Sequence, residues 1–245
     1  MTESWLQEAV KACRLPSAPS LPVLLKTVGV SLPLSLQPQS RLTSDHVRDW
    51  LVSRERAHGA LPTTSRRLHG CMVALAGKGV LFYDDADPEN QQRFTLVHEV
   101  AHFMLDHHLL RARSLRVFGR DILPVLDGQR APTPQEALSA VFERIPFGVQ
   151  VRFMERSALG DPCTGRAMEA ERRADRLAFE LLAPAKEVLP LLGCSSRPEV
   201  EAELVSRFGF PAKEARAYTR LLLAQQPARR PFFLESVPGE GQLHG

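Results

Sequence analysis

Apolar residues recur at two different spacings along this chain of 245 residues, and the spacings predict a mixed architecture. Most segments repeat apolar residues three and four positions apart, as helices do, while two short runs near residue 75 are continuous and bounded by glycine. The predicted helices cover residues 5–15, 24–30, 44–57, 94–110, 135–145, 168–184 and, with a turn inside, 199–224. The predicted strands cover 71–76 and 79–84. The pattern indicates a mostly helical α+β fold with a small antiparallel sheet beside the helix at 94–110.

Two segments have weaker patterns. Prolines at positions 33 and 38 indicate an irregular crossing between the second and third helices. Between residues 111 and 166 apolar spacing is poor, apart from the helix at 135–145, and the end of this stretch is typical of either a strand or an irregular lid.

Composition narrows the class of protein. Apolar residues make up 44% of the chain, which is enough for a sizeable core, and no window has the roughly 18 uninterrupted apolar residues of a membrane helix. The net charge of +3 is too weak to argue for a nucleic-acid partner. Four scattered cysteines and no secretory leader pattern indicate reduced thiols and a cytoplasmic location, and the absence of C-x-x-C spacing argues against zinc fingers.

The helix at 94–110 carries the motif H-E-x-x-H as His98, Glu99 and His102. Residues four apart share a helix face, so both imidazoles can reach one metal ion, and Glu99 then lies beside that ion without binding it. A carboxylate there can act as the general base and acid of a metalloprotease. The alternative is a pair of buried histidines with no metal, although the apolar residues around the motif favour a buried functional helix.

A third metal ligand is available on the helix at 168–184. Glu171 and Asp175 lie four residues apart on one face, and a catalytic zinc site commonly has three protein ligands. Glu171 suits the third position, and Asp175 suits a hydrogen bond to the outer nitrogen of a ligating histidine. The alternative is a solvated face of intrahelical ion pairs. We expect His107 and His108, at the exit of the first helix, to be surface residues or to lie behind the metal ligands.

Together these residues resemble a known family. The run RFTLVHEVAHFML, followed by E-x-x-A-D-x-L-A-x-x-L-L-A-P from Glu171 to Pro184, is similar to the ImmA/IrrE family of bacterial zinc metallopeptidases. The resemblance implies gluzincin-like zinc binding by His98, His102 and Glu171, with Glu99 as the base. It also implies a transcriptional repressor of the helix-turn-helix type as the substrate, cleaved in a stress response or on induction of a mobile element. The same nitrogen and oxygen donors also accept Mn²⁺.

Two features depart from the family pattern. His102 and Glu171 are 171 − 102 = 69 positions apart, which is long for the family and makes residues 111–166 an insertion. The insertion could form a lid or supply another ligand, such as Asp121 or Asp127. Asp175 stands where asparagine is frequent, which should strengthen the hydrogen bond to a ligating histidine.

The remaining assignments concern the substrate and the domains. We expect the strand residues Val80, Leu81, Phe82 and Tyr83 to form a free edge that binds an extended peptide. The group that stabilises the oxyanion is not identified, with Tyr218 and arginines of the insertion as candidates. We divide the chain into a metallopeptidase domain at 1–190, a helix-turn-helix-like unit at 195–228 and a flexible tail at 229–245. DNA binding by this unit is less favoured than packing or substrate docking, because acids nearly equal bases there.

The leading hypothesis is therefore a cytoplasmic zinc endopeptidase. Its main alternative is a DNA-binding or regulatory protein that uses the metallopeptidase fold only as a scaffold. A third alternative, a helical protein with chance motifs, would contain no stoichiometric zinc.

Overall fold

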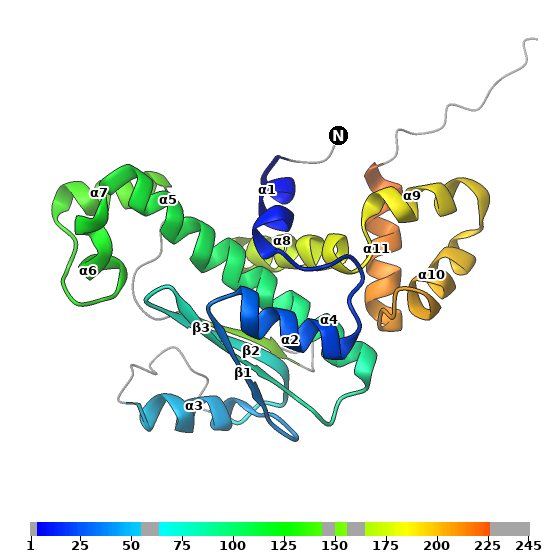
Figure 1. Ribbon diagram of the computed structural model, residues 1–245, viewed down its shortest axis with the longest axis horizontal. Coiled ribbons are helices and arrows are strands. Elements are labelled where there is room, and N and C mark those ends of the chain that lie inside the picture. The colour runs from blue at the N-terminus through cyan, green and yellow to red at the C-terminus, as the bar shows by residue number, and fades with distance from the viewer. Residues whose placement is uncertain (1–3, 55–63, 144–149, 156–164, 226–245) are drawn as a thin grey trace, which may run out of the picture.

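A computed structural model describes residues 4–54, 64–143, 150–155 and 165–225 and confirms the α+β class. One sheet lies between α3 on one face and α4 (Glu89–His102) with its neighbouring helices on the other (Figure 1). The helices before the metal-site motif are α1 (Ser4–Cys13), α2 (Leu21–Ser31) and α3 (Ser44–Val52). Those after it are α5 (Leu109–Phe118), α6 (Leu123–Leu126), α7 (Pro134–Glu143), α8 (Gly165–Leu182), α9 (Ala185–Cys194), α10 (Arg197–Ser206) and α11 (Ala212–Gln225).

The sheet is mixed rather than antiparallel. Its strands are β1 (Leu34–Pro38), β2 (Leu68–Leu75), β3 (Lys78–Tyr83) and β4 (Gln150–Glu155), in the spatial order β1-β3-β2-β4. Only the β1–β3 pair is parallel. The prediction of an irregular segment at 33–38 was wrong, because residues 34–38 form β1. Proline is tolerated here because β1 is an edge strand and Pro38 is its last residue, so no hydrogen bond between interior strands is lost.

The prediction that Val80, Leu81, Phe82 and Tyr83 form a free edge was also wrong. These residues belong to β3, which pairs with β1 on one side and with β2 on the other. Their backbone groups are therefore already used by the sheet. The misassignment arose because β1, which covers the second edge of β3, was predicted as an irregular segment. The stretch that contains β4 had been left open between a strand and an irregular lid. Among the described strands, the edges are β1 and β4.

Successive side chains of β2 point to opposite faces of the sheet and so belong to two different hydrophobic clusters. Met72 and Ala74 pack into the large cluster that contains α4, α8 and α11, whereas Cys71 and Val73 pack with α3. This two-sided burial explains why β2 is continuously apolar in sequence. The α4 helix consequently rests directly on the sheet.

The central helix is longer than predicted and has an irregularity. α4 begins at Glu89 and ends at His102, a π-helical turn covers Phe103–His108, and α5 continues the chain to Phe118. α5, α6 and α7 project away from the sheet (Figure 1). The segment 111–166 also contributes β4, so its end takes part in the main sheet.

The C-terminal helices pack onto the same core as α4. Tyr218 on α11 is buried, and its hydroxyl donates a hydrogen bond to the carbonyl oxygen of Ala183 at 2.8 Å. The Arg93 guanidinium on α4 donates to the carbonyl oxygen of Phe208, in the turn between α10 and α11, at 3.1 Å. The predicted two-helix pattern is present, and the division at 190–195 stays a prediction. The tail at 229–245 lies outside the described residues. Within the described part of the chain, no helix combines the length and apolarity needed to cross a membrane.

Candidate metal centre

Packing of α4 against α8 brings three candidate ligands together. The Nε2 atoms of His98 and His102 lie 3.1 Å apart. The two carboxylate oxygens of Glu171 lie 3.3 Å from them, Oε2 from His98 and Oε1 from His102. One ligand atom from each of the three residues falls within 4.8 Å of the others, and among the described residues this is the group that could hold a metal ion. Sequence positions 69 apart thus meet at one point.

These separations fit a tetrahedral ion. Zinc lies about 2.0–2.2 Å from nitrogen and oxygen ligands, so two ligands of a tetrahedral site are about 3.3–3.6 Å apart. Each imidazole Nε2 lies at that spacing, 3.3 Å, from one oxygen of the Glu171 carboxylate, His98 from Oε2 and His102 from Oε1, and the Nε2–Nε2 distance of 3.1 Å is slightly shorter. Two imidazoles and one carboxylate also form a donor set typical of catalytic zinc. The residues present therefore fit the metal that the sequence predicts.

The outer nitrogens of both imidazoles face carboxylates. His102 Nδ1 lies 2.9 Å from Asp106 Oδ2, and His98 Nδ1 lies 3.0 Å from Asp175 Oδ1. The contact between His102 and Asp106 is a hydrogen bond. The contact between His98 and Asp175 does not have hydrogen-bond geometry and is an ion pair when His98 is protonated. If the outer nitrogens carry the protons, both Nε2 lone pairs point toward the metal position. This is the orientation that ligation requires.

Electrostatics at the centre favour a cation. Burial lowers the pKa of His98, but the carboxylates of Asp175 and Glu171 outweigh burial and raise this pKa to about 10. Burial raises the pKa of the Glu171 carboxyl, but contacts with His102 and His98 outweigh it and hold the pKa far below its usual range. Glu171 is thus an anion that attracts positive charge, which a proton or a metal ion can supply. Metal binding should therefore release protons.

Glu99 is fully buried beside the ligands, between α4 and β2. Its negative charge also raises the pKa of His98. Gly70 on β2 makes room for it, because a methyl group at Gly70 would lie 3.2 Å from Glu99 Cγ and 2.4 Å from Thr95 Cγ2. A glycine in the strand thus lets the helix with the motif lie directly on the sheet.

Other sequence candidates lie elsewhere. Tyr218 is a core residue whose hydroxyl is bonded to a backbone carbonyl, so its candidacy for the oxyanion was wrong. The Asp127 carboxylate pairs with the Arg111 guanidinium at 2.6 Å rather than with a metal ligand. Asp121 is likewise absent from the group of candidate ligands. His107, expected at the surface or behind the ligands, is buried and accepts a hydrogen bond at Nε2 from the Gly77 amide at 3.0 Å.

The sequence analysis overlooked Asp106. It lies four residues after His102, the same spacing that relates the two histidines, and this spacing was the available signal. What could not be read was the π-helical turn in which Asp106 lies, since π turns have no firm sequence signature. Such turns are frequent at functional sites.

Comparison with known families agrees with this geometry. The model of the IrrE N-terminal-like domain, Peptidase_M78, matches residues 56–120, which contain the complete H-E-x-x-H motif. The match ends before Glu171, so it does not cover the third ligand, which rests on the geometry and on the motif from Glu171 to Pro184. No curated protein matches the chain. The match supports a metallopeptidase-type function and confirms the resemblance noted in the sequence: residues 56–120 of this chain carry an IrrE N-terminal-like domain.

Proposed function

We propose that the protein is a zinc-dependent endopeptidase that cleaves a specific protein in the cytoplasm. The observation that carries the proposal is the convergence of His98, His102 and Glu171 next to the buried carboxylate of Glu99. A metal site that served only the fold would not need an additional buried acid at its side. The family match supports the same class of reaction.

The chain's own residues can perform the proton transfers of peptide hydrolysis. Zinc held by the three ligands would polarise the scissile carbonyl and lower the pKa of a water molecule to about 7. Glu99 would accept a proton from that water and later donate it to the departing nitrogen. Asp106 and Asp175 would keep both imidazoles oriented while this happens.

The free edge of β4 is the binding strand that we propose for the peptide. β4 pairs with β2, the strand whose Gly70 lies against Glu99, and no other described strand pairs with its outer side. An extended substrate could add to this edge through backbone hydrogen bonds. β4 thus takes the substrate-binding role that the sequence had assigned to the strand containing Val80 to Tyr83.

For the substrate, we propose a transcriptional repressor of the helix-turn-helix type, on the strength of the family resemblance. A protein substrate also suits the charge near α11 better than DNA does. At the start of α11, burial raises the pKa of Glu214; the charge of Lys213 lowers this pKa and that of Asp175 raises it, so carboxylates and a lysine occupy the same helix end. DNA phosphates at that helix end would approach these carboxylates, which is unfavourable.

The test compares the zinc-loaded protein with Glu99→Gln in extracts of the cells that encode it. Mass spectrometry of new protein N-termini should find one or a few substrates cut by the wild type and uncut by Glu99→Gln, although both bind zinc equally. Glu169→Gln, at an exposed glutamate of α8, is the matched control and should cleave normally. Equal cleavage by wild type and Glu99→Gln would instead favour the scaffold hypothesis.

A further inference from the structure

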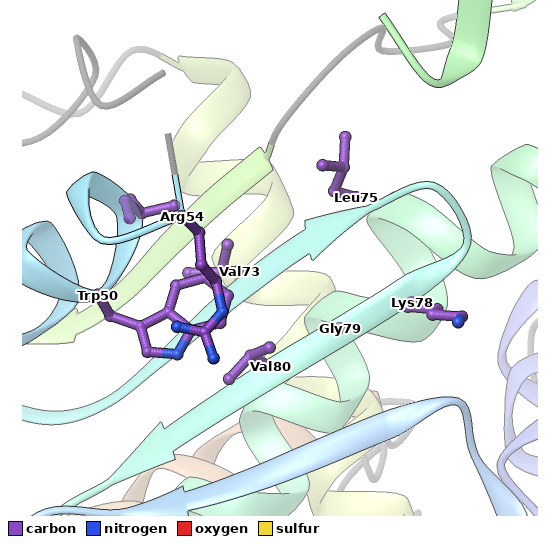
Figure 2. A pocket seen from close by; sticks show the side chains of 8 residues that line it. Trp50, Arg54, Val73, Leu75, Lys78, Gly79 and Val80 are labelled. Carbon is purple, nitrogen blue, oxygen red and sulfur yellow. The ribbon is translucent and has the colours of Figure 1, made fainter. Parts of the chain in front are cut away.

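A cavity of about 160 Å³ lies on the sheet face covered by α3, opposite the face on which α4 rests. Figure 2 shows Arg54 and Trp50 on one side of it and residues of the β2–β3 hairpin on the other. Leu51, Val73 and Val80 provide apolar lining. The cavity thus differs in position and in chemistry from the metal centre.

Among the described residues, the positive charge of Arg54 and Lys78 at this cavity meets no carboxylate. The Arg54 guanidinium carbon lies 4.3 Å from the centroid of the Trp50 ring, and its hydrogen bond is a long one of 3.4 Å to the Ser53 hydroxyl. Lys78 adds a second positive charge at the hairpin. The lining residues within the described part of the chain include no Asp or Glu, and no salt bridge there joins a carboxylate to Arg54 or Lys78.

We propose that this cavity binds a small carboxylic acid with a compact apolar body. An apolar wall beside a guanidinium suits such a molecule, because the planar guanidinium can bind both carboxylate oxygens while the body covers Val73 and Val80. The volume limits the size, since cavities for drug-sized ligands are about 300–1,000 Å³. A single ring or a short branched chain fits that limit, and an offset ring can pack against Trp50.

The ligand would bind on the α3 face of the sheet, and α4 packs on the opposite face of the same strands. Gly79, which lines the cavity, also lies next to the α4 side of the sheet, where an added methyl would meet Phe103 and Met72. His107 ties Gly77 in the same hairpin to the helical segment after the motif. The site nevertheless contains no proposed metal ligand, so its test does not depend on peptidase activity.

Trp50 itself can report on binding. The chain contains two tryptophans, and Trp5→Phe leaves Trp50 as the single reporter. Titration of this variant with sodium benzoate, at constant ionic strength, should give a saturable change in emission, and calorimetry should give the same affinity. Benzamide, which is neutral and similar in shape, should bind at least tenfold more weakly.

Substitutions of the lining residues in the Trp5→Phe protein test whether benzoate binds in this cavity. Arg54→Gln should weaken benzoate binding at least tenfold, and Lys78→Met by about two- to threefold, because an exposed charge is screened. Arg116→Gln and Lys26→Met, both at exposed positions of other helices, are matched controls that should change nothing.

Three results would overturn the proposal. They are no saturable binding by either method, equal affinity for benzamide, or unchanged affinity in an Arg54→Gln protein that melts like its parent. Arg54→Lys keeps the positive charge without the planar guanidinium, so its affinity for benzoate should lie between those of the parent and Arg54→Gln. This second variant separates loss of binding from a folding defect in Arg54→Gln.

Discussion

Gly70→Ala tests how closely the helix with the motif rests on the sheet. The added Cβ would lie 2.4 Å from Thr95 Cγ2, whereas carbon atoms in contact are about 3.5–4.0 Å apart. β2 and α4 must therefore separate by about 1 Å or more. The Phe82 carbonyl oxygen, at 3.3 Å, and Glu99 Cγ, at 3.2 Å, crowd the same position. Such overpacking typically costs about 1–3 kcal/mol, and we expect a destabilisation of this size.

The cleavage rate should also fall, by about 100-fold, because a shift of about 1 Å at a catalytic group can cost that much in rate. Urea denaturation of the zinc-loaded protein measures the free energy of unfolding, and cleavage of the substrate identified with Glu99→Gln measures the rate. Gly29→Ala is the control, since a methyl there meets no atom within 4 Å. It should be neutral or slightly stabilising.

A second substitution can relieve the clash. Thr95→Ser removes Cγ2 but keeps the hydroxyl that accepts a hydrogen bond from Gln91 Nε2 at 3.3 Å. In the Gly70→Ala background it should restore most of the lost stability, a coupling of about 0.5–3 kcal/mol. The reasoning is refuted if Gly70→Ala is as stable as wild type, or if Thr95→Ser gives no rescue.

Three further variants probe the surroundings of the metal centre. Asp106→Asn should lower zinc affinity about 10- to 100-fold by weakening the orientation of His102, as measured by competition with a chelator. Burial lowers the pKa of His107 to about 4, below its usual 6.5, so its contribution to stability is present above pH 6.5 and is lost as the pH falls toward 4. Between pH 6.5 and 5 the wild type should lose about 2 kcal/mol more than His107→Gln, as measured by denaturation at each pH, and parallel curves would contradict this. Tyr218→Phe should destabilise the whole protein by about 1 kcal/mol in one transition, whereas an early separate transition would show that α11 unfolds independently.

The sequence predicted the metal centre better than the sheet. His98, Glu99 and His102 are local in sequence, and helical geometry alone places them on one side of α4. Glu171 required the family resemblance, because a glutamate and an aspartate four apart are common on solvated helices. The structure then places Glu171 against both imidazoles.

Strand order could not be derived from the local pattern. β1 contains a proline at its end, and β4 begins 67 positions after β3 ends at Tyr83 (150 − 83 = 67). Neither strand therefore belongs to the recognisable hairpin. Pairing partners of this kind are set by long-range packing rather than by local propensity. The same holds for His107, whose burial depends on the distant turn at Gly77.

Zinc stoichiometry in Glu171→Ala and Glu99→Gln tests the central claim most directly. If α4 and α8 hold the metal together, the wild type and Glu99→Gln bind one zinc per chain, while Glu171→Ala loses it or binds it far more weakly. Full zinc retention by Glu171→Ala, or zinc absent from the wild type after loading and desalting, would contradict the account.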